Sequence, residues 1–542
     1  MGENVWKIAS RAPSKKTKNW LTLLLAKNRG LKTKKQVDDF LNPKIGEILS
    51  VRLTQTKGAI DRVEEAIGNS QKIIVYSDYD ADGICATAIV WETLFDLGAD
   101  VAPYVPHRIK EGYGLSKETI SELAKGGVKL IITVDHGVTA NEQIEHAQDL
   151  GIDVIVTDHH TLPKIPPKPY ALVHTTDLAG AGVAWRFCWD LVGKLNPSWR
   201  NELLEKLELA ALATVADLVP LTGANRAIVK LGLEKLANTR RPGLKALIRQ
   251  SGINGQIGTW EIGHILAPRI NAMGRIEHGM DSLRLLCTKN SSSAEKLAGL
   301  LGRTNSKRQD LTARALAQAL QMLDPDQTVG IIAHDSLHEG VIGLVASRLV
   351  EVHRRPMIVI ARGELYSRGS ARSIPGFNIV EAIRNSSEFL VDGGGHPMAA
   401  GFTIKTQYIE KFGQKINEYA QKRVTDELTS PVINIECELK LEDITPVTLE
   451  AIEQFEPWGV ANPQPIFSTK NMLVEDIRPV GLDNQHLKLR LSGFSAIGFG
   501  MREKMAQLRP GYLIDVVYTL DEDRYSGRGQ LQLKIKDIAI SN

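Results

Sequence analysis

The stretch KIIVYSDYDADGICATAIV, residues 72–90, carries three aspartates, Asp78, Asp80 and Asp82, between two apolar runs. Its opening KIIVY is short, apolar and rich in β-branched side chains, which predicts a buried strand, and residues 84–97 predict the helix that follows. The aspartates therefore lie at a strand-to-helix turn. Because alternate side chains of an extended segment share a face, the three carboxylates are expected to point together. Their mutual repulsion would then have to be relieved by a cation.

An EF-hand calcium loop or a solvated acidic turn would also place three aspartates in such a stretch. The EF-hand loop opens with D-x-D-x-D-G, but it requires a glutamate at its twelfth position. Counting from Asp78, that position is Ile89, so the EF-hand is excluded. A solvated acidic turn, in which Gly83 supplies the bend, accounts for the aspartates equally well when they are taken alone. The rest of the sequence has to decide between the turn and the cation.

Length and composition limit the class of protein. A chain of 542 residues is too long for one hydrophobic core, so three or four domains are expected. A hydrophobic content of 43% and a charged content of 24% are ordinary for a globular protein, and a net charge of +3 neither requires nor excludes nucleic acid. The four cysteines are scattered without a CxxC pair, which disfavours disulfides and structural zinc and favours a reducing compartment. Without a membrane-length apolar run or a recognisable signal peptide, we expect a cytoplasmic protein with no membrane partner.

A rhythm of strands and helices organises the first part of the chain. Strands are predicted at 72–76, 129–134 and 153–157, each followed by acids and then by helical sequence. This alternation predicts an α/β fold with a parallel sheet covered by helices. A long helix over 293–323 is expected to connect this lobe to a second α/β lobe. After residue 430 the sequence changes to short alternating strands, which predict a small OB-like β-barrel of the kind that binds single-stranded nucleic acid.

These features divide the chain into five segments. The predicted segments are a basic N-terminal lead-in (1–50), a domain with the parallel sheet (51–235), a helical connector (236–325), a second α/β lobe (326–428) and an OB-like nucleic-acid-binding domain (429–542). In the lead-in, residues 11–35 hold nine lysines and arginines and no acid. Such a density of positive charge is typical of a phosphate-binding patch, and equally of a solvated face.

Acids and histidines also follow the other predicted strands of the first sheet. The clusters are Asp135-His136-Gly137 after IITV, Asp158-His159-His160 after VIVT, and Asp217 at the end of a later apolar helix. Parallel sheets bind their ligands beyond the carboxyl ends of the strands, where at least three of the clusters lie. Carboxylate oxygens with one or two imidazoles suit Mn²⁺ or Mg²⁺ better than Ca²⁺ or Zn²⁺.

The carboxylates are too many for one ion. Two divalent ions about 3.5–4 Å apart, bridged by one carboxylate, would use them all, and such a pair drives phosphoester hydrolysis. His159 and His160 would point to opposite sides of an extended chain, so only one of them is expected to be a direct ligand. Taken singly, an aspartate after a strand is often a helix cap and a histidine is often a satisfied core residue. The clusters taken together favour the metal site.

The motifs resemble a known superfamily. SDYDADG (77–83), TVDHG (133–137), TDHH (157–160) and VADLVPL (215–221) resemble, in this order, the four motifs of the DHH phosphoesterase superfamily. The downstream runs PRINAMGR, GSARSIPGFNI, GGGHPMAAGF and FEPWGVANPQPIF narrow the resemblance to the RecJ family of single-stranded-DNA-specific exonucleases, whose second lobe is a DHHA1 domain. The resemblance covers roughly residues 50–542. Ser77 stands where the family usually has glycine, which removes no metal ligand.

The resemblance implies a role for each matching residue. The implied metal ligands are Asp78 and Asp80 for a first Mn²⁺ or Mg²⁺ ion, Asp82, His159 and Asp217 for a second, and Asp135 as the bridge. The implied catalytic residues are Asp135, Asp158 in a supporting role, and His160 near the scissile phosphate. The implied phosphate-binding residues are Arg108, Arg275, Ser370, Arg372, Gly394, Gly395 and His396. Arginine grips phosphate with two hydrogen bonds, and glycines let backbone N–H groups approach an anion, although a tight turn also accounts for the glycines.

The implied activity is a processive 5′-to-3′ exonuclease that acts on single-stranded DNA, releases 5′-mononucleotides, and serves DNA repair and recombination. A groove between the two lobes would admit one strand and exclude a duplex, and the OB-like domain would hold the incoming strand. Trp458, in the linker motif, is either a stacking platform or a core residue. Single-stranded DNA is the implied partner, with a helicase and a single-strand-binding protein as further candidates, and a monomer is expected.

Two alternative functions are disfavoured by the same sequence. Superfamily members that cut short oligonucleotides or cyclic dinucleotides usually end after the second lobe, whereas this chain continues from residue 430 to residue 542. A catalytically inactive scaffold would have lost metal ligands, whereas all of the implied ligands are present.

Overall fold

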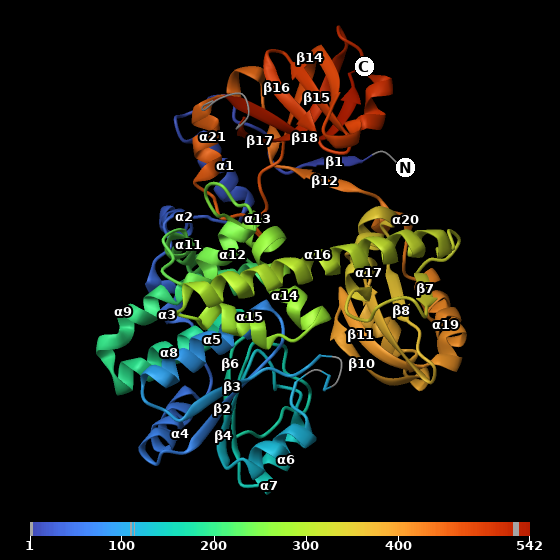
Figure 1. Ribbon diagram of the computed structural model, residues 1–542. Helices are drawn as coiled ribbons and strands as arrows, with labels where there is room; N and C mark the ends of the chain where they lie inside the picture. The colour runs from blue at the N-terminus through green and yellow to red at the C-terminus, as the bar shows by residue number, and fades with distance from the viewer. Residues whose placement is uncertain (1–3, 109–110, 113, 524–529, 542) are drawn as a thin grey trace.

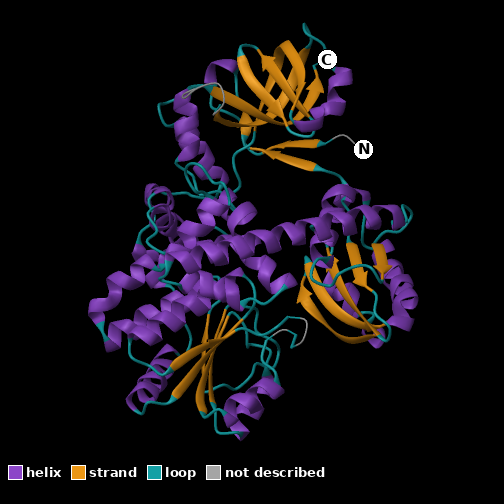
Figure 2. Cartoon of the chain, viewed as in Figure 1, coloured by secondary structure: helices purple, strands orange, loops and turns teal. Residues whose placement is uncertain are grey.

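The computed structural model describes residues 4–108, 111–112, 114–523 and 530–541. Figure 1 shows a parallel-sheet lobe at the bottom, a second lobe at the right and a barrel at the top, with a layer of helices between them. Figure 2 separates the same view into helices and strands, and the orange sheets of the two lobes and of the barrel have helices packed beside them. Among the described residues, no helix is long and apolar enough to cross a membrane.

The first lobe is built on a five-stranded parallel sheet in the order β3-β2-β4-β5-β6. The strands are β2 (Lys72–Ser77), β3 (Val101–Tyr104), β4 (Val128–Val134), β5 (Asp153–Asp158) and β6 (Ala171–His174). On β2, Ile73 and Val75 pack into one hydrophobic cluster, whereas Ile74 and Tyr76 pack into another. This alternation buries both faces of the sheet, as a parallel sheet requires. The predicted strands and the parallel sheet are confirmed.

Helices cover both faces of this sheet. Those on one face are α4 (Thr56–Gly68), α5 (Ala81–Asp96) and α8 (Gly180–Leu195), and those on the other are α6 (Lys117–Lys125) and α7 (Asn141–Asp149). Helix α5 begins earlier than predicted because Asp80 caps it: Asp80 Oδ1 accepts the N–H groups of Asp82 at 2.9 Å and Gly83 at 3.0 Å. Asp82 is therefore helical, and the expectation that it continues the extended pattern of Asp78 and Asp80 is wrong.

A helical layer lies above the first sheet. It consists of α9 (Arg200–Glu205), α10 (Leu207–Ala216), α11 (Gly223–Ala237), α12 (Pro242–Gln250), α13 (Thr259–Glu261), a π-helical turn (Ile262–Leu266), α14 (Ala267–Ile276) and α15 (Met280–Cys287). The long helix predicted over 293–323 is α16 (Ser291–Met322), which runs from this layer to the second lobe in Figure 1. Ala298 and Leu301 of α16 are buried in the core of the first lobe, and Ala315 and Ala319 are buried against the second. One continuous helix thus belongs to both cores.

The second lobe contains a mixed sheet in the order β10-β11-β9-β8-β7, in which only β7 and β8 are parallel. Its strands are β7 (Gly330–His334), β8 (Met357–Ala361), β9 (Tyr366–Arg372), β10 (Leu390–His396) and β11 (Ala399–Lys405). Its helices are α17 (Ile342–His353) on one face, and α18 (Ile379–Arg384) and α19 (Ile409–Gln421) on the other, with the short α20 (Asp426–Thr429) after them. The glycine-rich β10 lies at the edge of the sheet.

The C-terminal strands close into a barrel, which confirms the predicted OB-like fold. The strands are β14 (Phe467–Val480), β15 (His486–Leu491), β16 (Phe494–Gly498), β17 (Leu513–Glu522) and β18 (Leu531–Ile540). Closure follows from the pairing of β14 with both β15 and β17. The short β13 (Cys437–Glu438) extends the sheet, and α21 (Pro446–Glu453) packs beside it. Trp458 is half-buried against the barrel core.

The N-terminal segment packs on the barrel, a contact that the sequence did not predict. Strand β1 (Val5–Ile8) pairs in parallel with β12 (Val432–Ile435), and α1 (Trp20–Asn28) places Leu25 in the barrel core. Two cations of the basic stretch form ion pairs with barrel acids: Lys16 with Asp443 at 2.5 Å and Arg29 with Glu436 at 3.0 Å. These two charges are therefore compensated within the protein. Helices α2 (Lys34–Leu41) and α3 (Ile45–Ser50) lead from there to the first lobe.

A single buried arginine joins the barrel unit to the first lobe. Arg226 of α11 donates hydrogen bonds to the carbonyl oxygens of Phe40 at 2.6 Å, Glu456 at 2.7 Å and Pro457 at 3.3 Å. Its guanidinium also lies 3.9 Å from the centre of the Phe40 ring. The Arg226 joint thus ties α11, α2 and the linker before the barrel together through three backbone groups.

Candidate active site

The acidic clusters meet beyond the carboxyl ends of β2, β4 and β5. Ligand atoms of Asp78, Asp80 and Asp135 all lie within 4.8 Å of one another, and those of Asp82, His159 and Asp217 do the same. A third combination, of Asp135 with His159 and His160, satisfies the same distance. Two of these three sets share no residue, and Asp82, in the first turn of α5, belongs to a different one from Asp78 and Asp80.

His159 lies between carboxylates of both sets. Its Nε2 is 3.1 Å from Asp135 Oδ1, 3.6 Å from Asp217 Oδ2 and 3.9 Å from Asp82 Oδ2. Within the described part of the chain, neither His159 Nε2 nor Asp135 Oδ1 has a hydrogen-bond partner, although both are buried. Buried polar atoms are almost always satisfied, so two unsatisfied atoms that face each other fit a missing cation. Burial and the charge of His160 lower the pKa of His159 to about 4, so its ring is neutral, as a metal ligand must be.

The N-terminus of α8 fixes Asp82. The N–H of Gly180 donates to Asp82 Oδ2 at 2.8 Å, and the N–H of Ala181 donates to Asp82 Oδ1 at 2.6 Å. Gly180 also lies against Asp135: a Cβ atom at Gly180 would stand 2.4 Å from Asp135 Oδ1. The start of α8 therefore holds one carboxylate by hydrogen bonds and leaves room for another.

Burial and mutual repulsion disfavour the ionised form of the clustered carboxylates. Burial, reinforced by neighbouring carboxylates, raises the pKa of Asp78 and Asp135 well above the usual range, that of Asp82 to about 7 and that of Asp217 to about 8. Buried carboxylates that repel one another favour their neutral forms unless a cation compensates them. Two divalent cations would supply that compensation, so these residues fit a metal pair.

Asp158 is bonded to the protein rather than open to the clusters. Its Oδ1 accepts from the N–H of His159 at 2.7 Å and of His160 at 3.1 Å and lies 2.8 Å from His160 Nδ1, while its Oδ2 accepts from the N–H of Val138 at 3.0 Å. Burial alone would lower the pKa of His160, but the hydrogen bond and charge of Asp158 outweigh it and raise that pKa to about 9. His160 is therefore a cation at neutral pH. Burial would raise the pKa of Asp158, but His160 lowers it to about 2.

The second lobe reaches this site through β9 and β10. The ring of His396 is stacked on the ring of His160, with centroids 6.0 Å apart and planes inclined by 16°. On β9, Arg372 donates to Ser370 Oγ at 3.1 Å and to Ser347 Oγ of α17 at 3.2 Å. These contacts put side chains of both lobes on one site.

Arg108 and Arg275 face the same place from the first lobe. The guanidinium of Arg108 lies 5.0 Å from the centre of the Tyr79 ring, and Arg275 Nη1 lies 3.5 Å from the carbonyl oxygen of Gly340 in the second lobe. Burial lowers the pKa of Arg275 to about 10 and that of Arg372 as well, and the charge of Arg108 lowers both further. Three guanidinium groups held close enough to repel one another favour an anion between them.

The glycines of β10 divide into two kinds. Gly395 has φ +145°, and a Cβ there would stand 2.3 Å from the carbonyl oxygen of Ala399, so the chain's own backbone accounts for this glycine. At Gly394 a Cβ would meet nothing within 4 Å, and the residue is exposed. The backbone at Gly394 is therefore open to a ligand, and a tight turn accounts for Gly395 alone.

Two residues that the sequence motifs did not single out position the first aspartates. Asn271 Oδ1 accepts the N–H of Ala81 at 2.7 Å, and a Cβ at Gly274 would stand 2.4 Å from the carbonyl oxygen of Tyr79. Both hold α14 against the turn that carries Asp78 and Asp80. Both residues lie in the run PRINAMGR (268–275), in which only Arg275 was predicted to have a role.

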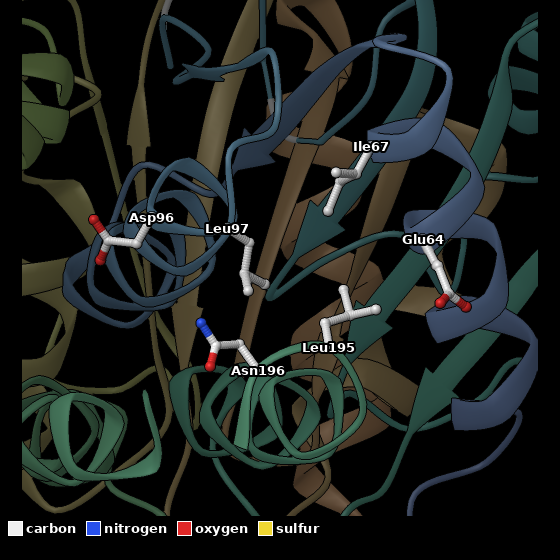
Figure 3. A pocket seen from close by; sticks show the side chains of 6 residues that line it. All are labelled: Glu64, Ile67, Asp96, Leu97, Leu195 and Asn196. Carbon is white, nitrogen blue, oxygen red and sulfur yellow. The ribbon is translucent and has the colours of Figure 1, made fainter. Parts of the chain in front are cut away.

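The pocket of Figure 3 is a separate feature. It is lined by Glu64, Ile67, Asp96, Leu97, Leu195 and Asn196. These residues belong to α4 and to the C-terminal ends of α5 and α8, whereas the acidic clusters lie at the N-terminal ends of α5 and α8. Each of these two helices has 16 residues, so a length of about 24 Å separates the pocket from the clusters.

Family models match three parts of the chain. The DHH family N-terminal domain matches residues 72–216, the DHHA1 domain matches residues 309–422, and the RecJ OB domain matches residues 435–537. The matches follow one another in the order of the first lobe, the second lobe and the barrel.

Curated and solved proteins match nearly the whole chain. The single-stranded-DNA-specific exonuclease RecJ of Bacillus subtilis is 37% identical over 96% of this chain and 68% of its own length, and the enzyme of that name from Thermus thermophilus is 35% identical over 88% and 70%. The crystal structure of Thermus thermophilus RecJ in complex with Mn²⁺ matches 99% of this chain and 80% of its own, with a TM-score of 0.85 and 31% identity. The structure of the same protein with Mg²⁺ matches with a TM-score of 0.80.

Proposed function

The chain belongs to the RecJ family of single-stranded-DNA-specific exonucleases, and on that basis we propose that it degrades single-stranded DNA from the 5′ end and releases 5′-mononucleotides. It is a metal-dependent hydrolase. The observation that carries the proposal is the pair of ligand sets around Asp135 and His159, open to arginines from both lobes. A cation pair beside an anion site is the arrangement that phosphodiester hydrolysis requires.

In this proposal the ligand sets divide between two ions of Mn²⁺ or Mg²⁺. Asp78 and Asp80 would hold the first ion, and Asp82, His159 and Asp217 would hold the second, as their grouping supports. Asp135, which lies within the first set and 3.1 Å from His159, would serve both ions. Bound ions of this kind lower the pKa of a water to give the nucleophile and stabilise charge on the attacked phosphorus. Gly180 and Ala181 keep Asp82 oriented for binding.

The catalytic residues in this proposal are Asp135, His160 and Asp158. His160 carries a positive charge at neutral pH and donates a hydrogen bond to a non-bridging oxygen of the scissile phosphate. Asp158 supports His160 by holding its Nδ1 at 2.8 Å, which fixes the ring and keeps it protonated. A charge placed in advance where negative charge develops needs no reorganisation during the reaction.

The second lobe and two arginines of the first hold the 5′ end. The proposed phosphate ligands are Arg108, Arg275, Ser370, Arg372, the backbone of Gly394 and Gly395, and His396. The open backbone at Gly394 and the crowding of three guanidinium groups support this assignment. A phosphate fixed on one side of the metal centre would limit cleavage to the first internucleotide bond, which gives a mononucleotide product.

The joining of the lobes supports single-strand specificity. Helix α16 is buried in both cores, and His160 stacks on His396 across the lobes, so the distance between them is held. We propose that this fixed distance admits one strand and excludes a duplex, and that the barrel holds the incoming strand. In this proposal residues 51–235 form the catalytic domain, residues 326–428 form the substrate-binding domain, and residues 429–542 form the nucleic-acid-binding domain. On family grounds we further propose a cytoplasmic monomer in DNA repair and recombination, supplied with substrate by a helicase and a single-strand-binding protein.

The test is digestion of a single-stranded DNA that carries a label at the 5′ end in one reaction and at the 3′ end in another. We expect the 5′ label to appear first, as a mononucleotide, with Mn²⁺ present, and no release with a chelator. The variant Asp135→Asn should release none, and Asp149→Asn, an exposed aspartate of α7, should act like the wild type. Early release of the 3′ label, or cleavage limited to di- to tetranucleotides, contradicts the proposal.

A further inference from the structure

Trp260 exposes a large aromatic surface in the helical layer. Its side chain is 58% exposed, and its ring is stacked on the exposed ring of His264, with centroids 5.0 Å apart and planes inclined by only 13°. His264 Nδ1 lies 3.1 Å from the carbonyl oxygen of Trp260. The two rings therefore lie nearly parallel, and more than half of the Trp260 side chain is open to solvent. A fixed indole in this position costs little ordering entropy when a flat ligand stacks on it.

This stack lies on the helical run that leads to the candidate active site. Helix α13 passes through the π-helical turn directly into α14, whose last turn carries Arg275. Between Trp260 and His264 in sequence, Gly263 lies beside α10: a Cβ there would stand 3.9 Å from Val215 Cγ1. Val215 is in the last turn of α10, which ends at the metal-ligand candidate Asp217. The helical run that carries the stack thus packs against the end of α10 that leads to Asp217, and Figure 1 shows α13 on the side of the helical layer toward the barrel.

Leu218 is a second exposed apolar residue near the end of α10. It follows Asp217 directly, its side chain is 70% exposed, and its backbone has φ +59°. A leucine in the left-handed region is strained, and an exposed leucine gains no core packing that would offset the strain. Leu218 therefore places an exposed apolar group next to Asp217 in the chain, at the end of the helix that Gly263 packs against.

Two arginines lie on the helices that follow this stack, one on α14 and one on α16. Arg269, in the first turn of α14, donates to the carbonyl oxygen of Ile265 at 2.8 Å, and Arg308 of α16 donates to Asn305 Oδ1 at 2.9 Å. The charge of Arg269 lowers the pKa of Arg308, so the two guanidinium groups lie near each other. Within the described residues, neither forms an ion pair with a carboxylate. Exposed aromatic and apolar groups beside uncompensated cations match a ligand that carries flat bases on a phosphate chain.

We propose that Trp260, backed by His264 and continued by Leu218, forms a stacking surface for bases of single-stranded DNA on their way from the barrel to the metal centre. The proposal rests on the proposed function, since it names where the bases of that substrate lie. The phosphates of the same nucleotides face Arg269 and Arg308. The stack lies on a helical run that carries Arg269 and ends at Arg275 of the candidate active site, so a nucleic acid strand fits it better than an apolar protein partner does.

The first experiment measures binding without cleavage. Fluorescence anisotropy of a labelled single-stranded 20-mer, in chelator, is compared for wild type, Trp260→Ala, Trp260→Phe and Phe95→Ala. Phe95 is the matched control, because it is also 58% exposed but lies at the opposite end of α5 from the metal centre. Loss of one base stack should raise the Kd about 5- to 50-fold for Trp260→Ala. Trp260→Phe should stay within about threefold, and Phe95→Ala should match the wild type.

The second experiment identifies the nucleotide whose base stacks on Trp260. A series of 20-mers carries one abasic nucleotide at successive positions from the 5′ end. For one or two abasic positions, the wild type should bind the 20-mer about as weakly as Trp260→Ala binds the intact strand. The affinity of Trp260→Ala should not depend on the position of the abasic nucleotide. The inference is overturned if wild type and Trp260→Ala bind the intact 20-mer with the same Kd. It is also overturned if the ratio of their Kd values is the same at every abasic position.

Activity separates this inference from the proposed function. In Mn²⁺, Trp260→Ala should raise KM for the 20-mer and leave kcat and the hydrolysis of a 5′-phosphorylated dinucleotide unchanged, which also shows that the variant is folded. If wild type cuts single-stranded DNA and Trp260→Ala matches it in KM, only the stacking surface is contradicted. If wild type does not cut single-stranded DNA at all, the proposed function fails first.

Discussion

At the scale of single residues, the candidate ligands are distinguished by buried polar atoms that the rest of the protein does not satisfy. Asp135 Oδ1 and His159 Nε2 face each other at 3.1 Å, neither atom has a hydrogen-bond partner in the described part of the chain, and burial raises the pKa of Asp135 well above its usual range. Asp158 differs, because backbone N–H groups and His160 satisfy both of its oxygens. The same residue type thus serves as a candidate ligand in one place and as a support in another, according to its hydrogen bonds.

His160 should act on the phosphate rather than on the metal. Replacing His160 by glutamine removes the positive charge that Asp158 stabilises, so kcat on single-stranded DNA should fall roughly 100-fold or more. Mn²⁺ binding, measured by calorimetry, should stay within about threefold of wild type. His160 also lies within ligand distance of Asp135 and His159. A large loss of Mn²⁺ affinity in His160→Gln would therefore assign it to the metal.

Asp217 should make stability depend on pH. Its pKa is raised to about 8 in the folded chain, from about 3.9 in an unfolded one. The stability it contributes is therefore present below pH 4 and is lost as pH rises through about 8. In chelator, the Tm of Asp217→Asn relative to wild type should rise steadily between pH 5 and pH 8. With excess Mn²⁺ the order should reverse, because wild type binds the ion more tightly. Parallel Tm curves would contradict the raised pKa.

At the scale of elements, two helix N-termini build the site. Helix α5 starts at the capping Asp80 and places Asp82 in its first turn, and α8 starts with Gly180 and Ala181, whose N–H groups bind Asp82. Partial positive charge at a helix N-terminus stabilises a carboxylate there. The site therefore depends on where these helices begin as much as on which residues they carry.

Gly180 is the position where this geometry can be tested. In Gly180→Ala the new Cβ would stand 2.4 Å from Asp135 Oδ1, so Asp135 or α8 must shift. We expect Mn²⁺ affinity and kcat to fall at least tenfold while circular dichroism stays unchanged. The control is Gly302→Ala in α16, where a Cβ meets nothing within 4 Å. That change should preserve activity and stabilise the protein by about 0.5–1 kcal/mol. Equal activity of the two variants would contradict the packing argument.

At the scale of the whole molecule, buried contacts between the three units hold them in one arrangement, and two of these contacts stand out. Helix α16 is buried in the cores of both lobes, and the Arg226 joint ties the barrel and the N-terminal segment to the first lobe. Breaking the three hydrogen bonds of this buried guanidinium would leave polar groups unsatisfied where water does not reach them. Separating the barrel from the first lobe at the Arg226 joint therefore costs free energy. A strand that contacts the barrel therefore meets the metal centre at a fixed distance.

Opening the Arg226 joint should affect long substrates more than short ones. Arg226→Met keeps an aliphatic side chain against Phe40 but loses the hydrogen bonds to Phe40, Glu456 and Pro457. The Kd for a single-stranded 20-mer should rise about tenfold, and the radius of gyration from small-angle scattering should increase. Hydrolysis of a 5′-phosphorylated dinucleotide should stay within about threefold of wild type. The control is Arg249→Met, because Arg249 is exposed and forms an ion pair with Glu295 on the surface. An unchanged scattering profile for Arg226→Met would show that other contacts fix the barrel.

The sequence by itself determined the elements and the chemistry. The apolar run before Asp78 predicted β2, the repeated strand-and-acid pattern predicted the parallel sheet, and the late alternating strands predicted the barrel, because periodicity is a local property of the chain. The residue types at the strand ends likewise indicated hard divalent ions. The resemblance to a known family implied how the candidate ligands divide, and only the tertiary structure supplied a physical reason: the cap at Asp80 turns the chain into a helix before Asp82, whose carboxylate lies close to His159 and Asp217. Only the tertiary structure decided the packing of the N-terminal segment on the barrel and the Arg226 joint. Those contacts link residues hundreds of positions apart, and the free energy that selects them comes from packing and hydrogen bonds that no local pattern contains.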